Sequence, residues 1–234
     1  MCLNAEASFA AASLVGAAGL VAISSVRDSR QLVLATLPLG FAVHQAAEAV
    51  TWRYLDSSTS GTCAGTSVTV WVVFAWALVP GWLSLGVSLV ETDARRRRAM
   101  GWLVGLGLLL APVWLWQALS PDVYARATGG HLEYPLPEPE VGWLVPAYLL
   151  VALVPPLISS HVWLRRLGSA GVVSALITTG VSLYTWPSLW CLCAAALSVL
   201  VVAHLRSVSP SGAPLAGPSS RPAGSTPTAG EPSR

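Results

Sequence analysis

Long apolar stretches separated by short polar segments make up most of this chain. A helix needs about 20 mainly apolar residues to cross a hydrocarbon layer of about 30 Å. Seven stretches meet that requirement, at residues 8–26, 31–52, 67–90, 100–119, 142–163, 168–186 and 188–206. They are continuous and do not alternate over about ten residues, as the strands of membrane β-barrels do. The pattern therefore predicts an all-α fold, an integral membrane bundle of seven helices.

Composition indicates one membrane domain followed by a tail. Hydrophobic residues make up 54% of the chain and charged residues only 10%, and the mean hydropathy is +0.62. The predicted transmembrane domain covers residues 1–206. Residues 207–234 are rich in Ser, Pro, Gly and Thr and have almost nothing to bury, so we expect a disordered tail. The formal net charge of +2 arises in the loops and predicts no nucleic-acid partner.

All 13 basic residues are arginines, and their distribution predicts the orientation of the chain. One side of the seven-helix topology has eleven of them: Arg27, Arg30, Arg95, Arg96, Arg97, Arg98, Arg165, Arg166, Arg206, Arg221 and Arg234. The other side has only Arg53 and Arg126. Short cytoplasmic loops retain Lys and Arg. The N-terminus is therefore predicted outside and the C-terminus in the cytoplasm, with the lipid bilayer of the inner (plasma) membrane as the first partner.

Prolines interrupt the predicted spans at several depths. They are Pro38, Pro80, Pro112, Pro146, Pro155 and Pro156. A proline inside a helix frees a carbonyl and bends the helix, and in lipid that carbonyl must be satisfied by neighbouring groups or water. Kinked helices packed around a narrow centre are one interpretation, and an opened polar cavity is the other. Of the predicted outer loops, 53–65 and 120–141, the second is expected to form a hairpin or cap over the bundle.

Ionisable residues inside a span are energetically unfavourable and usually face the bundle interior. On the second span His44, Glu48 and Trp52 are spaced four apart, so they line one helix face. Below Trp52, at the outer boundary, Glu48 lies about 6 Å deep and His44 about 12 Å deep. An imidazole and a carboxylate one turn apart can share a proton or ligate a metal. The alternatives are a hydrogen-bonded pair that joins neighbouring helices and a lipid-facing stripe.

Further candidate ligands belong to the same outer level. Cys2 precedes the first span, His131 lies in the long outer loop, and Cys191 lies one turn into the seventh span. Together with His44 and Glu48 they are adequate in type and number for a divalent transition metal such as zinc. The alternative for Cys191, and for Cys193 beside it, is a small buried hydrophobe. The alternative for Cys2 is an outer disulfide with Cys63.

A second polar set lies near the inner boundary. Glu91 ends the third span, Ser159, Ser160 and His161 end the fifth, and His204 ends the seventh. Their common depth suggests a proton relay or a second metal site. The alternative is that residues near span ends reach the interface or water, with Glu91 paired to the arginines at 95–98. Those arginines are expected to fix the topology and to contact anionic headgroups.

Four segments carry a resemblance to a known family. They are MCLNAEASF at the start, LPLGFAVHQAAEAVTW on the second span, HLEYP in the outer loop and SLWCLCAAALSVLVVAHLR on the last span. In this order they resemble a bacterial multi-pass membrane family without an assigned function. Its members open with a Met-Cys-Phe-Ser-Ala-like string and carry an His/Gln-Gln-x-x-Glu-Gly-x-x-Trp-like motif. Leu3, Asn4 and Ala49 depart from that pattern. The resemblance runs from Met1 to Arg206 and implies an integral membrane protein, but no activity.

Two function classes stay open after these observations. Retinal binding of the rhodopsin type requires a lysine, and the chain has none, so retinal is excluded. The first class is a membrane-embedded enzyme with a polar pocket around His44 and Glu48, metal-assisted and acting on a lipid or small amphiphile. A weak analogy to seven-span metal hydrolases resembling alkaline ceramidases favours it, although their paired His-x-x-x-His is absent. The alternative is a non-catalytic sensor or scaffold that binds a ligand or a protein partner.

Overall fold

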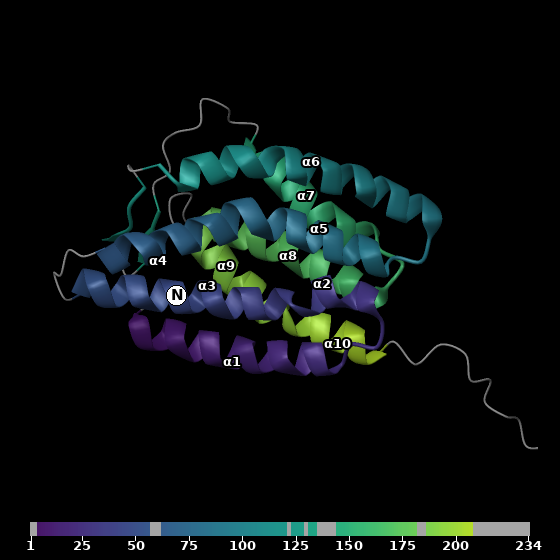
Figure 1. Ribbon diagram of the computed structural model, residues 1–234, viewed down its shortest axis with the longest axis horizontal. Helices are drawn as coiled ribbons and strands as arrows, with labels where there is room; N and C mark the ends of the chain where they lie inside the picture. The colour runs from purple at the N-terminus through teal and green to yellow at the C-terminus, as the bar shows by residue number, and fades with distance from the viewer. Residues whose placement is uncertain are drawn as a thin grey trace, which may run out of the picture.

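The computed structural model describes residues 4–56, 62–120, 123–128, 131–134, 144–181 and 186–207. Its helices form seven rods that lie side by side with roughly parallel long axes (Figure 1). The rods are α1 (Ala5–Ser24); η1 (Ser29–Gln31), α2 (Leu32–Ala35) and α3 (Leu37–Asp56); α4 (Thr62–Val72), η2 (Val73–Leu78) and α5 (Val79–Val90); α6 (Ala94–Ala118); α7 (Leu144–Ile158); α8 (Val162–Val181); and α9 (Trp186–Leu197) with α10 (Val199–Ser207). The all-α prediction is confirmed.

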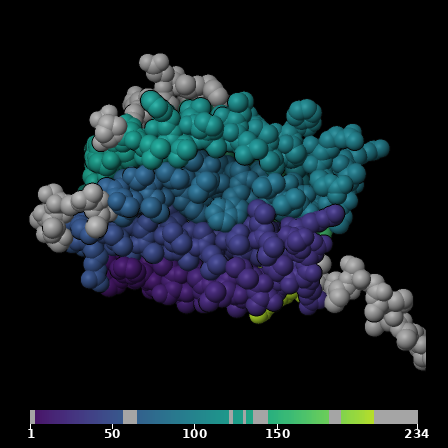
Figure 2. All heavy atoms as spheres, in the orientation of Figure 1, coloured from purple at the N-terminus to yellow at the C-terminus, as the bar shows by residue number. Residues whose placement is uncertain are grey.

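Five helical segments are long and apolar enough to cross a membrane. They are Ala5–Ser24, Ser29–Asp56, Gly65–Val90, Ala94–Ala118 and Ser188–Ser207, whereas the apolar α7 is shorter. The outward face of α6 shows what such a segment presents, since Trp102 is 78% exposed and Trp116 is 82% exposed. The two indoles are 14 residues apart on the helix, which is about 21 Å. Leu108 and Leu109 lie between them and are also exposed, so the outward face of α6 is apolar, and Figure 2 shows the face to which α6 and α1 contribute.

Two of the prolines free carbonyls that side chains of other rods then satisfy. The η2 segment is a π-helix, in which the amide of Val79 donates to the carbonyl of Phe74. The next amide in that register belongs to Pro80, which has no N–H, and the carbonyl of Ala75 accepts from the Tyr148 hydroxyl at 2.9 Å instead.

The second such carbonyl lies on α7. The Ser84 hydroxyl on α5 donates at 2.5 Å to the carbonyl of Val151, four residues before Pro155. Both freed carbonyls are therefore satisfied by neighbouring helices, as expected for a proline within an apolar bundle.

Close packing of α1 against α3 depends on small residues. A Cβ atom added at Gly19 would lie 2.9 Å from the backbone nitrogen of Leu39. At Gly16 the added atom would lie 3.5 Å from the Cβ atom of Ala42. Gly19 therefore lets the two backbones approach, whereas Gly16 makes an ordinary contact.

The predicted boundary between the fifth and sixth spans is wrong. The fifth was expected to end at residue 163, with Ser159, Ser160 and His161 inside it, but α7 ends at Ile158 and α8 begins at Val162. The three polar residues form the turn between them. This turn is stable because the Arg165 guanidinium donates to the carbonyls of Ser159 and Ser160, at 2.9 and 2.8 Å.

The long loop between α6 and α7 contains the predicted hairpin. β1 (Arg126–Thr128) pairs antiparallel with β2 (His131–Glu133), with Arg126 opposite Glu133. Their side chains form an ion pair at 2.6 Å, which raises the pKa of Arg126. Leu132 on β2 and Tyr134, which follows β2, are buried in the hydrophobic core. We call this end of the bundle the cap end, and the end with the turns at 25–31, 91–93 and 159–161 the arginine end.

Candidate functional site

Glu48 joins three rods at the cap end of the bundle. Its side chain has 0% exposed surface. One carboxylate oxygen accepts from the indole N–H of Trp71 on α4 at 3.0 Å, and the other accepts from the hydroxyl of Ser188 on α9 at 3.1 Å. Since a buried polar group is costly without hydrogen bonds, these donors explain how α3 can hold a carboxyl group inside an apolar bundle.

His44 lies one turn before Glu48 and is enclosed by aromatic rings. Its ring centroid is 4.8 Å from that of Trp71 and 5.0 Å from that of Phe74. The side chain has 0% exposed surface, and neither ring nitrogen makes a hydrogen bond of standard geometry with a described residue. An imidazole buried in this way lowers the stability of the fold, so packing alone does not account for it.

The predicted polar stripe on the second span faces the interior. His44, Glu48 and Trp52 are all buried on α3, which excludes the lipid-facing alternative. The hydrogen bonds of Glu48 match the interpretation in which it joins neighbouring helices. Within the described residues no opening leads to His44 or Glu48, because both side chains are fully enclosed.

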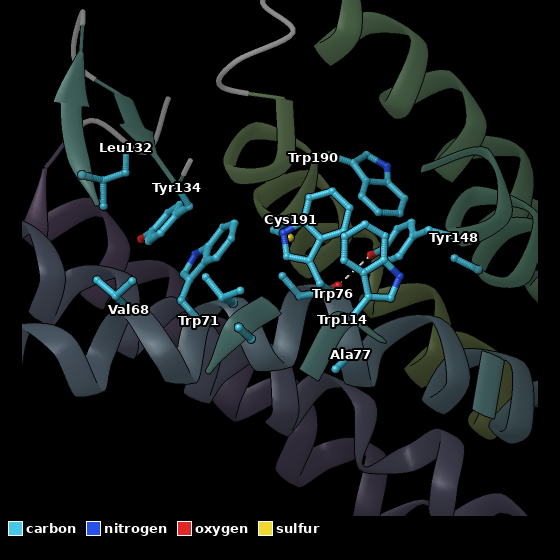
Figure 3. Packing of buried hydrophobic residues seen from close by; sticks show 14 of the residues in the cluster. Val68, Trp71, Trp76, Ala77, Trp114, Leu132, Tyr134, Tyr148, Trp190 and Cys191 are labelled. Carbon is cyan, nitrogen blue, oxygen red and sulfur yellow. Dashed lines mark hydrogen bonds between the residues drawn. The ribbon is translucent and has the colours of Figure 1, made fainter. Parts of the chain in front are cut away.

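Trp71 connects this buried group to the cap. Its ring stacks on Tyr134, just after β2, with centroids 3.7 Å apart and planes 10° from parallel. Figure 3 shows the two rings beside Val68 and Leu132, apart from the cluster around Trp76 and Tyr148. The same indole therefore contacts the cap on one side and reaches Glu48 and His44 on the other.

A pocket of about 170 Å³ lies beside this contact at the cap end. Its lining comes from the end of α3, the start of α4 and the segment before β1: Thr51, Tyr54, Leu55, Gly65, Val68, Val123, Tyr124 and Ala125. Most of this lining is apolar. Thr51 lies three residues after Glu48, and its hydroxyl is 2.8 Å from that of Ser67.

Among the described residues, the other predicted ligands of the outer set do not come together as a metal site. Cys2 and the side chain of Cys63 fall outside the described residues, so their disulfide stays a prediction. His131 is partly buried on β2, its Nδ1 atom has no partner among the described residues, and burial lowers its pKa. Cys191 is a buried free thiol beside Trp190 in the core. The described residues contain no group of three or more His, Cys, Asp or Glu arranged to hold a metal. The zinc site stays a prediction.

Glu91 is the centre of the polar set at the arginine end. Its carboxylate accepts from the hydroxyl of Ser159 at 3.0 Å and from the backbone amide and hydroxyl of Ser160 at 2.7 and 2.5 Å. It also accepts from the backbone amides of Thr92 and Asp93, both at 3.0 Å. Burial would raise the pKa of Glu91, but these hydrogen bonds, that of the Ser160 hydroxyl foremost, lower it to about 2.

The expected pairing of Glu91 with the arginines at 95–98 is wrong. Among the described residues its carboxylate makes no ion pair, and Arg97 contacts its backbone carbonyl instead, at 3.5 Å. The backbone amides of the turn reach the carboxylate directly. They are better placed than long, exposed arginine side chains.

The two histidines predicted at the inner boundary do come together. The rings of His161 and His204 are 4.7 Å apart with planes at 64°. His161 Nε2 lies 2.9 Å from the carbonyl of Val90. Both histidines and Glu91 line a pocket of about 310 Å³.

Several residues of both groups were missed by sequence reasoning. At the cap end these are Trp71, Ser188 and Tyr134, and at the arginine end they are Asp28, Arg30 and Gln31. For Trp71 and Ser188 the sequence does give one signal, because each is a hydrogen-bond donor within an apolar stretch. The partners that they reach are 23 and 140 residues away, a distance in sequence over which no periodicity extends.

The comparisons with known proteins give a family and no activity. A model described as a family of unknown function (DUF6629) matches residues 1–214. No curated protein and no solved structure matches the chain. The matched range includes every helix described above, together with both polar groups.

Proposed function

The chain belongs to the DUF6629 family, and we propose that it is a non-catalytic membrane sensor that binds a small amphiphile at its cap end. The observation that carries the proposal is the indole of Trp71, which links the cap to the buried Glu48 and His44. We further propose that all seven rods cross the inner (plasma) membrane, with the N-terminus and the cap outside.

The distribution of arginines supports this orientation. Arg27, Arg30, the run at 95–98 and Arg165 belong to turns or helix starts at the arginine end, and Arg206 lies in the last turn of α10. Positively charged residues are retained on the cytoplasmic side. A reporter that is active only in the cytoplasm, fused after Arg206, should therefore be active. An inactive but well-expressed fusion would reverse the orientation or remove one crossing.

The cap pocket suits one end of an uncharged amphiphile. Leu55, Val68 and Ala125 offer apolar surface, and the hydroxyl groups of the lining can hydrogen-bond a polar head. A volume of about 170 Å³ is smaller than most pockets for whole drug-sized ligands, which begin at about 300 Å³. It fits part of a ligand whose chain continues into the bilayer.

A ligand in this pocket would affect the buried Glu48 and His44 through two helices that line the pocket, α3 and α4. Val68 lies one turn before Trp71 on α4, and Thr51 lies one turn after Glu48 on α3. A shift of either helix would change the Trp71–Glu48 hydrogen bond and with it the contact to Ser188 on α9. Since α9 is followed by α10, that shift has a route to the arginine end.

The enclosure of His44 and Glu48 favours sensing over catalysis. A catalytic group must come within hydrogen-bond reach of its substrate, and neither side chain has exposed surface. Catalysis would require the aromatic rings around His44 to move aside first. Sensing requires only that their packing respond to the cap.

A blocked pocket tests the proposal. Gly65 lines the pocket, and a Cβ atom added there meets nothing within 4 Å, so Gly65→Leu should fill the pocket without a clash. Gly105→Leu on α6 is the matched control, since its added Cβ also meets nothing within 4 Å and it lies outside the pocket. Monodecanoylglycerol should raise the melting temperature of the wild type and the control in nanodiscs, but not that of Gly65→Leu.

Hydrogen exchange in the same samples tests the sensing step. The amphiphile should protect residues 123–134 and also change exchange at the arginine end. Protection confined to the cap would show that the amphiphile binds but that no structural change reaches the arginine end, which would contradict the sensing step. An equal thermal shift in Gly65→Leu and the wild type would contradict the pocket itself.

A metal-assisted enzyme acting on a lipid or small amphiphile is the second candidate. Its support is the imidazole of His44, whose two nitrogens lack hydrogen bonds of standard geometry with described residues, one turn from a carboxylate. Ala5, three residues after Cys2, is buried in the same cluster as Trp52 and Trp71. Metal analysis of the purified protein should then find zinc, with less in His44→Ala and Glu48→Gln. No metal in any of the three would exclude this candidate.

A further inference from the structure

The pocket at the arginine end has hydrogen-bond donors without acceptors to match. It has a volume of about 310 Å³ and is lined by side chains from four separate segments, including Asp28, Arg30, Glu91, Arg97, His161 and His204. Arg30 and Arg97 are exposed at its rim. Their guanidinium groups form no ion pair with any described residue.

Both carboxylates of the pocket accept hydrogen bonds from the turns in which they lie. Asp28 accepts from the amide of Arg30 at 2.9 Å and caps the short helix η1. Glu91 accepts the three amide and two hydroxyl hydrogen bonds described above. In the part of the chain that the structure describes, neither carboxylate forms an ion pair with Arg30 or Arg97.

His204 supplies the independent observation that a ligand belongs here. Its side chain is only 2% exposed, and its Nε2 atom has no hydrogen-bond partner among the described residues. The imidazole nevertheless lines the pocket. A buried polar atom without a partner is unfavourable, and an acceptor atom placed in the pocket would remove that penalty.

We propose that this pocket binds a phosphate group, held by Arg30, Arg97 and His204. Guanidinium groups bind phosphate oxygens through paired hydrogen bonds, and the imidazole N–H of His204 would donate to a third oxygen. The phosphate is carried either by a lipid headgroup of the cytoplasmic leaflet or by a soluble phosphate ester. The position at the ends of the helices, level with anionic headgroups, favours the lipid.

Three probes separate these sources in phosphatidylcholine nanodiscs. Phosphatidic acid incorporated in the disc tests the headgroup, and inorganic phosphate and glycerol 3-phosphate in the buffer test the soluble source. Binding is measured as the concentration-dependent rise of the melting temperature. We expect phosphatidic acid to raise it, and a rise with either soluble probe would support the same phosphate site with a soluble ligand.

The variants decide whether the pocket causes the effect. The double substitution Arg30→Gln and Arg97→Gln should weaken binding of the active probe by about tenfold or more. The control, Arg95→Gln with Arg98→Gln, removes the same charge from exposed arginines outside the pocket. It should bind as the wild type does. Equal losses in the two double variants would contradict the site and indicate general attraction to the arginine end.

His204→Phe distinguishes a binding role from a structural one. Phenylalanine keeps the ring against His161 and removes the unpartnered nitrogen. The unliganded variant should therefore melt at the same temperature as the wild type or higher, while its affinity for the active probe falls. A lower melting temperature with unchanged affinity would show that His204 serves the fold. No response of the wild type to any of the three probes would overturn the proposal.

Discussion

The two ends of the bundle stabilise a buried carboxylate in different ways. Glu48, inside the rods at the cap end, accepts from side chains of two other helices. Glu91, at a turn of the arginine end, accepts three of its hydrogen bonds from backbone amides. Within a helix the backbone amides are already used, whereas at a turn they are free. A carboxylate at mid-helix therefore joins distant rods, and one at a turn orders the turns around it.

This difference also accounts for which of the two carboxylates lines a pocket. The donors of Glu48 are an indole and a hydroxyl that approach through tight packing, so the group is sealed together with His44. The donors of Glu91 belong to short turns, and beside them a pocket of about 310 Å³ stays unfilled. The enclosed Glu48 and His44 suit the transmission of a structural change, and the pocket beside Glu91 suits binding of an ion.

The largest effect is expected from removing the sealed carboxylate. Glu48→Ala leaves the Trp71 and Ser188 donors without their acceptor and opens a cavity, so it should lower the free energy of unfolding by about 3–5 kcal/mol. Glu48→Gln keeps one acceptor oxygen and should cost about half as much. Glu6→Ala, an exposed glutamate on α1, is the control and should change stability by less than about 0.5 kcal/mol. Denaturation in detergent measures all three, and equal losses would contradict the account.

At the arginine end, the contribution of Glu91 to stability should depend on pH. Hydrogen bonds hold the pKa of Glu91 at about 2, below the ordinary glutamate value of 4.5. Its stabilisation is therefore complete above about pH 4.5 and is lost as the pH falls to about 2, a loss of no more than about 3 kcal/mol because solvent screens a group at a turn. Glu91→Gln should lower stability at neutral pH and flatten the profile in that window. Parallel profiles for variant and wild type would show that other groups dominate.

A smaller effect is expected from removing the hydroxyl that donates to the carbonyl freed by Pro155. Ser84→Ala removes the hydroxyl that serves the carbonyl of Val151, so stability should fall by about 1–3 kcal/mol. Ser88→Ala is the matched control on the same helix, because that hydroxyl bonds only within its own helix, to the carbonyl of Leu85. The control should lose no more than about 0.5 kcal/mol. Melting temperatures in one detergent compare the pair.

The smallest effect should come from removing the tail. Residues 208–234 lie outside the described part of the chain, and their composition predicts that they add nothing to the bundle. Truncation after Ser207 should leave expression and melting temperature unchanged, and phosphate binding at the arginine end as well. A drop of several degrees would show that the tail docks on the bundle.

The sequence predicted the helices well because apolar length and arginine placement act locally. The stripe of His44, Glu48 and Trp52 is buried because helical periodicity fixes which residues share a face. The common depth of Glu91, Ser160, His161 and His204 was a sound guide, since they gather around one turn and pocket. The error at residues 159–163 arose because hydropathy does not register a three-residue turn.

The donors to Glu48 and the lining of the pocket required the three-dimensional structure. Ser188 is 140 residues from Glu48, and Arg30 reaches the pocket from a loop that was assigned only a topological role. Hydropathy gives the depth of each residue in the bundle but not its rotation or its neighbour. Contacts between rods therefore could not be predicted, although the residues on one rod could.

Labelling of single cysteines tests the contrast between a sealed and an open end most directly. The background has its four native cysteines replaced by alanine, and a water-soluble maleimide is added to opened membranes. His161→Cys should react quickly, because it lines the open pocket. His44→Cys should react only after denaturation, because aromatic rings enclose that position. Similar rates at the two positions in the folded protein would contradict the account.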